Sequence, residues 1–319
     1  MELRHLRYFQ AVAEALNFTK AAAQLRVAQP ALSRQVQDLE EEIGVDLLVR
    51  SPRGVTLTAE GKLFLAEVKD LLARADESIE KVRALARGEY GELHVGYAPT
   101  PTSEILPRAL AAFQRVAPRV QVVLHDLAGD EMYAGLRDGT LHLAITAQSA
   151  SNAPITGVTY EELRQYVFCV ALPPGHRLAK KKAVSLAEVA AEPLVALRKR
   201  DYSEYHVILQ HIFAPSRLRP NIAAEVDGAN TLITGVESGR GVAVVTELFR
   251  SITGERLLYR PIIDCPVTQS VGLACAVEGD ITPAGEKFRD VLREVAGELG
   301  MGGKGKGKCE VSPRGKKRT

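Results

Sequence analysis

Apolar residues along the first 87 positions recur every three or four residues, the spacing of amphipathic α-helices. Between residues 19 and 43 the pattern breaks once, so it predicts two short helices joined by a turn. Thr19 is the expected N-cap of the first, and Pro30 suits the first turn of the second. A helix over residues 3–16 is also predicted, because two short helices cannot bury a core alone. The expected buried positions are Leu3, Leu6, Phe9, Val12, Leu16, Ala22, Leu25, Leu32, Val36, Leu39 and Ile43.

The polar face of the second short helix carries side chains suited to reading DNA. Gln29, Ser33, Arg34 and Gln37 lie away from the apolar stripe and can hydrogen-bond to base edges and phosphates in a major groove. The alternative is an ordinary amphipathic helix whose solvated face is rich in Gln and Ser. The stretch therefore predicts a helix-turn-helix unit with a recognition helix.

Residues 47–57 follow as two short extended runs around a turn, which predict a wing. Arg50 and Arg53 would lie on this wing, where an arginine can enter a minor groove. Solvated hairpin arginines are the alternative. Residues 1–58 hold seven basic and seven acidic residues, so the argument for DNA depends on where the charges lie and not on their sum.

Residues 59–87 predict one long helix, with Thr58 as N-cap and Gly88 at its end. Six acidic and six basic residues surround an apolar seam that has no core of its own. We expect the seam to pack on the same helix of a second subunit, with packing on the chain's own body as the alternative. The seam consists of Phe64, Val68, Leu71, Ala75, Ile79, Val82 and Leu85.

Strand-like and helical runs alternate from residue 88 to 300, which predicts an α/β domain. Ligands bind such folds at the carboxyl ends of the strands. Strands are expected at 93–97, 120–124, 141–146, 166–172, 194–197, 222–226, 242–245 and 271–277, and helices at 104–117, 130–138, 203–214, 229–238 and 284–298.

Three segments, LRYFQAVAEALNFTKAA, QPALSRQVQDLE and RSPRGVTLTAEG, resemble the DNA-binding domain of the LysR-type transcriptional regulators. The resemblance implies base or phosphate contacts from Gln29, Pro30, Ser33 and Arg34, with Arg53 on the wing. Two positions depart from the family pattern. Ala28 stands where a capping Ser is usual, and Leu47 stands where a Phe is usual.

The same resemblance covers residues 1–298 and implies a periplasmic-binding-protein-like (type 2) effector domain. Lobe I would comprise residues 90–161 and 266–300 and lobe II residues 162–265, with crossings near 162 and 265. The family further implies a homodimer through residues 59–87, a homotetramer built as a dimer of dimers, double-stranded promoter DNA and RNA polymerase as partners, and a cytoplasmic location.

The segment RGEYGELHVGYAPTPTSEILPRALAAF is similar to the branch of the family that regulates catechol, benzoate and chlorocatechol breakdown, which commonly senses muconate-like dicarboxylates. Thr100 falls where relatives hold the effector with a hydroxyl, and Thr102 adds a second donor at a helix start. Arg198 and Arg200 follow a strand of lobe II and would hold carboxylates, unless they form a solvated surface run.

Thr246 is a further candidate because it follows another strand. Gly129 departs from the branch, whose members usually offer a hydroxyl there. These residues predict a small organic anion in the cleft, with a muconate-like dicarboxylate as one candidate.

The remaining composition narrows the function class. The chain has no signal-peptide pattern and no apolar run long enough for a bilayer. Its four cysteines and seven histidines show no metal-ligand spacing, and no catalytic motif is present, so neither an enzyme nor a cofactor or metal is expected. Cys265 and Cys275 could be proposed as a redox pair, although buried or idle thiols fit better.

The tail 301–319 carries a net charge of +6 and is expected to be disordered, either as an aid to nonspecific DNA binding or as an extension without a role. A solute-binding transport protein and a catalytic α/β protein are the rival classes. The sequence favours a LysR-type regulator with a winged helix-turn-helix domain (1–58), a linker helix (59–87) and an effector domain (88–300).

Overall fold

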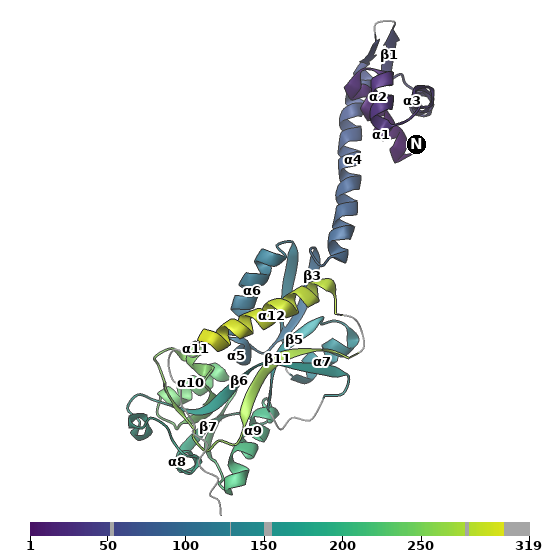
Figure 1. Ribbon diagram of the computed structural model, residues 1–319. Coiled ribbons are helices and arrows are strands. Elements are labelled where there is room, and N and C mark those ends of the chain that lie inside the picture. The colour runs from purple at the N-terminus through teal and green to yellow at the C-terminus, as the bar shows by residue number, and fades with distance from the viewer. Residues whose placement is uncertain (52–53, 128, 150–154, 278–280, 303–319) are drawn as a thin grey trace, which may run out of the picture. The chain divides into compact units, whose positions relative to one another are not determined.

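The computed structural model describes residues 1–51, 54–127, 129–149, 155–277 and 281–302 (Figure 1). The chain divides into two compact units, Met1–Ala86 and Arg87–Thr319. Two sequence predictions lie outside the described residues: Arg53 on the wing and the basic tail from residue 303 onward. In the described part of the chain, no helix combines the length and apolar composition needed to cross a membrane.

The first unit begins with three helices, α1 (Leu3–Ala15), α2 (Phe18–Leu25) and α3 (Gln29–Ile43). The predicted cap of α2 was wrong by two residues: Asn17 is the N-cap, and its Oδ1 accepts a hydrogen bond from the Lys20 amide at 3.0 Å. The helices share one core, which includes most of the predicted positions. Leu3, Leu16 and Ile43 were wrongly placed in it; they lie at or beyond helix ends, and 36–49% of their surface is exposed.

A two-stranded wing and a long helix complete this unit. Strands β1 (Leu48–Ser51) and β2 (Gly54–Leu57) pair antiparallel, as the sequence predicted. Helix α4 (Ala59–Ala86) starts with Thr58, whose hydroxyl accepts a hydrogen bond from the Gly61 amide at 2.8 Å. It ends shortly before Gly88, whose φ of +63° a helix does not tolerate.

The seam on α4 divides into two parts. Val68 is fully buried and Phe64 partly buried against the DNA-binding core, while Leu71, Ile79, Val82 and Leu85 are 46–68% exposed. An apolar row of this length on an isolated helix indicates a surface that a further chain covers.

The second unit contains two lobes with separate cores. In lobe I, strands β3 (Gly91–Tyr97), β4 (Val120–Asp126) and β5 (Leu143–Ser149) are parallel in the order β4-β3-β5. Helices α6 (Ile105–Val116) and α12 (Pro283–Gly302) pack against each other and against this sheet (Figure 1). Helix α7 (Gly129–Asp138) belongs to a second cluster in the same lobe, and α5 (Pro99–Thr102) is a short helix that the sequence did not predict.

Strand β6 (Val158–Leu172) runs through both lobes without a break. Residues up to Val167 pair with β11 (Thr268–Ala276) in lobe I, and residues from Phe168 pair with β9 (Ala243–Thr246) and β10 (Leu258–Pro261) in lobe II. The first crossing therefore lies at Val167–Phe168, later in the chain than the predicted position near 162, because the strand continues through it.

Lobe II is completed by the parallel pair β7 (Pro193–Leu197) and β8 (Asn221–Val226) and by α8 (Leu186–Ala190), α9 (Ser203–Phe213), α10 (Ala229–Glu237) and α11 (Phe249–Thr253). Sequence patterns did not predict α8, α11 or β10, each of which is five residues or shorter. Two single-turn 3₁₀ helices, Arg177–Lys180 and Ala214–Ser216, were also not predicted.

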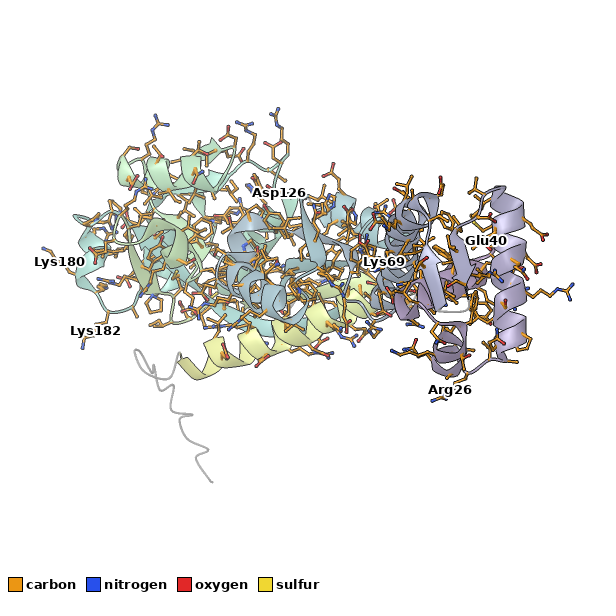
Figure 2. All side chains as sticks on the ribbon, turned by 90° about the horizontal axis from the view of Figure 1, so that it is seen from above. Arg26, Glu40, Lys69, Asp126, Lys180 and Lys182 are labelled. Carbon is orange, nitrogen blue, oxygen red and sulfur yellow. The ribbon has the colours of Figure 1, made fainter. Side chains whose placement is uncertain are left out.

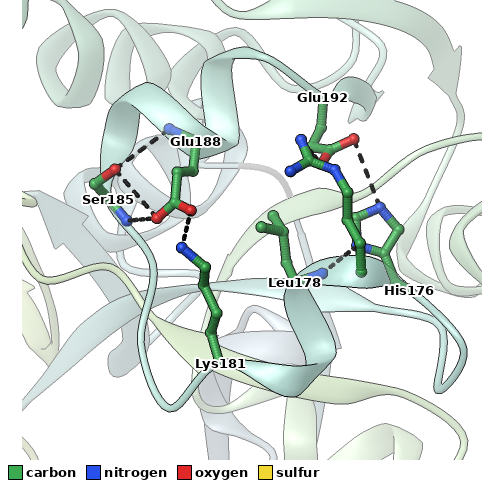
Figure 3. Close-up of polar contacts among 7 residues, drawn as sticks. His176, Leu178, Lys181, Ser185, Glu188 and Glu192 are labelled. Atoms are coloured by element: carbon green, nitrogen blue, oxygen red, sulfur yellow. Dashed lines mark hydrogen bonds and ion pairs between the residues drawn. The ribbon is translucent and has the colours of Figure 1, made fainter.

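Charged side chains fix the loop that leads into α8. Lys181 and the Ser185 cap both converge on the Glu188 carboxylate, and His176 faces the buried Glu192 at 3.6 Å (Figure 3). The Ser185–Glu188 pair is a capping box, which explains how so short a helix starts where it does.

Candidate DNA-binding surface and effector cleft

The first turns of α3 present an exposed polar surface. Gln29, Pro30, Arg34 and Gln37 are exposed, and Arg34 makes no ion pair with any residue that the structure describes. Helix α3 starts without a side-chain cap at Ala28, so its first amide groups stay free. Free amide groups, an unpaired guanidinium and amide side chains on one helix end are the donors that DNA phosphates and base edges accept.

Arg50, predicted as a DNA contact, is held by side chains of its own unit. Its guanidinium donates to Glu40 Oε2 and to Ser33 Oγ, each at 3.1 Å, and stands 5.0 Å from the centre of the Phe18 ring. Two residues predicted as DNA contacts, Ser33 and Arg50, therefore bond to each other. Both side chains remain partly accessible to solvent, although each already forms a hydrogen bond inside the DNA-binding unit.

Glu40 is the residue that sequence reasoning missed here. No role was predicted for it from the sequence, yet its side chain is only 10% exposed. Figure 2 labels its position. Its Oε1 accepts the backbone amides of Leu47 and Leu48 at 2.9 Å each. Glu40 thus anchors the start of the wing to the recognition helix, and the signal was its position one turn beyond Val36, on the edge of the buried stripe.

A cleft of about 920 Å³ opens between the two lobes of the second unit, at the carboxyl ends of the strands. Residues after β3, β4 and β5 line it from lobe I, and residues after β7, β8 and β9 line it from lobe II. Helices α7, α9 and α10 begin at its rim. The location agrees with the sequence-based expectation of an effector site between the lobes.

The five predicted effector residues are only partly brought together. Thr100, Arg200 and Thr246 line the cleft. Thr102 does not: it is 1% exposed, and its hydroxyl donates to the Ala98 carbonyl at 2.7 Å. Arg198 does not line the cleft either, and both arginines pair with Asp201, at 3.3 Å from Arg198 and 3.1 Å from Arg200.

Carboxylates dominate the polar lining of the cleft. Five acidic residues face it against one guanidinium, a net charge of −4; they are Asp126, Asp130, Asp201, Glu204 and Asp227. The sequence patterns did not single these acids out, because each looks like a surface residue next to a helix start.

Glu204 is the acid whose surroundings differ most from water. The residue as a whole is solvent-exposed, but its carboxyl stands between the cleft walls, where desolvation raises its pKa and the charge of Asp130 raises that pKa further. Asp227 behaves in the opposite way, since hydrogen bonding to Thr231 lowers its pKa.

Three histidines that are distant in the sequence meet on the α7 side of lobe I. His94 Nδ1 lies 3.0 Å from His125 Nε2, and the His94 amide donates to His142 Nδ1 at 2.9 Å. Burial and the neighbouring His94 lower the pKa of His142. No group of His, Cys, Asp and Glu side chains in the described ranges has the geometry of a metal site.

The described cysteines are free thiols. Cys169, Cys265 and Cys275 are free thiols whose pKa values burial raises, in the case of Cys275 to about 11. Cys265 packs against the lobe II core and Cys275 lies in the lobe I core, so they do not form a pair. Cys169 and Cys275 are buried and Cys265 is partly buried, and raised pKa values disfavour the reactive thiolate form.

Two family models match the chain. The LysR substrate binding domain matches residues 86–297, and the model of bacterial regulatory helix-turn-helix proteins of the lysR family matches residues 3–62. Together they confirm the predicted fold class, with a winged helix-turn-helix unit and a two-lobed α/β domain.

Similar proteins and structures span almost the whole chain. YnfL of Escherichia coli (strain K12), an uncharacterized HTH-type transcriptional regulator, is 33% identical over 91% of this chain and 97% of its own. The Hca operon transcriptional activator HcaR of the same strain is 32% identical over 92% and 98%. The crystal structure of full-length CbnR with its target DNA superposes with a TM-score of 0.80 at 31% identity, covering 93% of this chain and 100% of CbnR. The chain therefore belongs to the LysR family of bacterial regulatory helix-turn-helix proteins, which are regulators and not enzymes.

Proposed function

We propose that the protein is a cytoplasmic transcriptional regulator that binds promoter DNA through α3 and whose binding and activation respond to a small effector in the cleft. The observation that supports DNA binding most directly is the exposed first half of α3, where the side chains of Gln29 and Arg34 form no hydrogen bond or ion pair with other described residues. The complex of CbnR with its target DNA gives a precedent in a chain of the same fold.

Within this surface the predicted contacts take different roles. We assign direct contacts to Gln29, Pro30 and Arg34, and we assign Ser33 and Arg50 a positioning role through their bond to each other and to Glu40. Arg53 stays a prediction from the sequence.

The assembly is proposed from α4. Its exposed row of Leu71, Ile79, Val82 and Leu85 fits the same row of a second subunit, which would give the homodimer of residues 59–87. Two recognition helices about one turn of DNA apart would then read a two-fold symmetric site. A dimer of dimers and contact with RNA polymerase are expectations from the family.

The effector is proposed at the level of a small molecule held between the lobes. The organic anion predicted from the sequence stays a prediction, and the cleft weighs against it: five carboxylates face the cavity, and the one lining arginine is already paired with Asp201. A muconate-like dianion, and with it control of aromatic breakdown, has no evident cationic partner there.

DNA protection by the full chain on the region upstream of its own gene tests the regulator proposal. We expect a protected site with two-fold symmetry, and a loss of about tenfold or more in affinity for Arg34→Ala, since a bidentate base contact contributes ~1–3 kcal/mol. Arg115→Ala, on the exposed surface of α6, is the matched control. Absence of any protected site, or equal losses in both variants, would contradict the proposal.

A further inference from the structure

We infer that the effector cleft accepts a small organic cation whose ammonium or amidinium group is held by the carboxylates of Glu204 and Asp130. This inference rests on the function proposed above and names the chemical class of the effector. Four steps lead to it, beginning with the balance of charge in the cleft.

Most of the negative charge in the cleft is not neutralised from within the protein. Asp201 is paired with Arg198 and Arg200, and Asp227 is hydrogen-bonded by Thr231. Asp126, Asp130 and Glu204 form no hydrogen bond or ion pair with any residue that the structure describes, although all three face the cavity. An anionic effector would meet these three charges with no free cation opposite them.

The helices that begin at the cleft do not reverse this sign. Helices α7, α9 and α10 point their amino ends at the cavity, and each contributes the equivalent of about half a positive charge, so roughly +1.5 in all. The lining side chains contribute a net −4. The negative charge of the lining side chains is therefore larger than the positive charge of the helix ends, and the electrostatic potential in the cleft is negative.

Glu204 reaches across the cleft from lobe II to lobe I. It stands in the first turn of α9, and its Oε1 lies 2.9 Å from where a Cβ would be at Gly129, the first residue of α7. A serine or threonine at position 129, as in the aromatic-degradation branch, would occupy this space. The departure from the family pattern therefore makes room for a carboxylate, which lies next to Asp130.

Two like charges from opposite lobes raise each other's energy while they lack a partner. Burial is the main cause of the raised pKa of the Glu204 carboxyl, and the charge of Asp130 raises that pKa further. A cation between them would relieve the repulsion and bind both lobes at once, so its affinity is higher where the lobes approach.

Lobe II supplies a polar atom and an apolar surface for the rest of the ligand. Thr246 is 4% exposed and lines the cavity, and no described residue forms a hydrogen bond with its hydroxyl. An unsatisfied hydroxyl facing a cavity favours a ligand with a donor or acceptor at that depth. Phe168, Ile208 and Phe249 line the same cavity with apolar groups, which suit a ligand with a hydrocarbon or aromatic body.

Thermal shift and calorimetric titration of the full chain test the inference. The probes are putrescine, agmatine and phenethylamine as cations, and benzoate and cis,cis-muconate as anions, at one ionic strength. We expect at least one amine to stabilise the protein and neither carboxylate to do so. Glu204→Gln and Asp130→Asn should each weaken amine binding about tenfold or more, the loss of one charge-assisted contact.

Glu294→Gln, which removes an exposed carboxylate on α12, is the matched control and should bind amines like the unsubstituted protein. Stabilisation by carboxylates alone, by no probe at all, or with equal affinity in the Glu204 and Glu294 variants would overturn the cation assignment. DNA protection by the same samples separates the two proposals: a retained footprint leaves the regulator function standing, whereas its loss in the unsubstituted protein overturns that function itself.

Discussion

The recognition surface and the effector cleft use charge in opposite ways. On α3 the exposed Arg34 has no partner among the described residues, and the buried acid Glu40 is fully engaged by Arg50 and two backbone amides. In the cleft the arginine is paired, and it is the carboxylates of Asp126, Asp130 and Glu204 that lack partners. Unpaired groups mark where an outside molecule is expected to bind, and here they have opposite signs.

This contrast explains why net charge alone is uninformative for this chain. The formal charge of +2 over 319 residues does not show that the α3 surface suits a polyanion and the effector cleft suits a cation. Separate signs also reduce binding at the wrong site, because a cationic effector is repelled from Arg34, the arginine proposed to contact DNA.

Removal of the Glu40 carboxylate should have the largest effect of the substitutions considered, and that effect is on stability. Glu40→Ala leaves two backbone amides and Arg50 without their acceptor, so we expect the free energy of unfolding of the first unit to fall by about 2–3 kcal/mol. Calorimetry of the full chain would follow that transition. Glu41→Ala, at the exposed neighbouring position, is the control, and a matching loss there would show that Glu40 has no special role.

The two arginines should separate binding from positioning. Arg34→Ala is expected to weaken DNA binding with no change in melting temperature, and to reduce the salt dependence by about one phosphate contact if Arg34 meets the backbone. Arg50→Ala is expected to lower the melting temperature of the first unit as well, since it breaks the bonds to Glu40 and Ser33. Identical effects of both variants on stability would contradict the division of roles.

A hydroxyl side chain at position 129, as in the aromatic-degradation branch, should make the cleft less suited to a cation. In Gly129→Ser the new Cβ meets Glu204 Oε1 at 2.9 Å and must displace that carboxylate from Asp130. Amine affinity should drop about three- to tenfold, within the range of a single lost polar contact. Titration with the same amines measures this, and Gly297→Ser on α12, where a Cβ meets nothing within 4 Å, is the control. An unchanged affinity in Gly129→Ser would remove Gly129 from the argument.

Amine binding should weaken as the pH falls. Glu204 has a raised pKa, so it loses its charge at a higher pH than an ordinary glutamate with a value near 4.5. Affinity is therefore expected to decline in this higher range, as pH falls through the raised pKa. Titrations between about pH 8 and about pH 5 measure it. Glu204→Gln should remove this dependence, and persistence of the same decline in that variant would assign it to another group.

The smallest expected effect is that of Glu204→Gln on the stability of the second unit in the absence of a ligand. A carboxyl whose pKa is raised by folding destabilises the folded protein fully above that raised pKa, and the penalty declines as the pH falls toward the ordinary value near 4.5. At neutral pH, Glu204→Gln should therefore raise the melting temperature of the second unit slightly, while it abolishes the shift caused by amines. A lower melting temperature in this variant would indicate that Glu204 supports the fold.

The sequence predicted most of the architecture, because long periodic segments determine their own type of structure. Helices such as α3 and α6 and strands such as β3 were predicted within a few residues of their bounds. The failures were short or depended on distant parts of the chain: α11 is five residues long, and the extent of β6 is set by pairing with β11.

The candidate sites were predicted less completely, for the same reason. Gln29 and Arg34 could be chosen from one helical face, whereas the engagement of Arg50 depends on Glu40 across the turn. Acids of the cleft such as Glu204 were missed, because only folding brings helix starts from both lobes together. An anion was predicted from Arg198 and Arg200, and no local pattern showed that both pair with Asp201.

The unbroken course of β6 has a mechanical consequence. The strand is hydrogen-bonded in lobe I up to Val167 and in lobe II from Phe168, and its register shift against β11 leaves out Leu163 within lobe I. A change in the angle between the lobes must then be distributed as added twist over several residues, and the energy rises steadily with that angle. The joint is elastic, so a bound ligand would set a small, graded displacement instead of releasing a hinge.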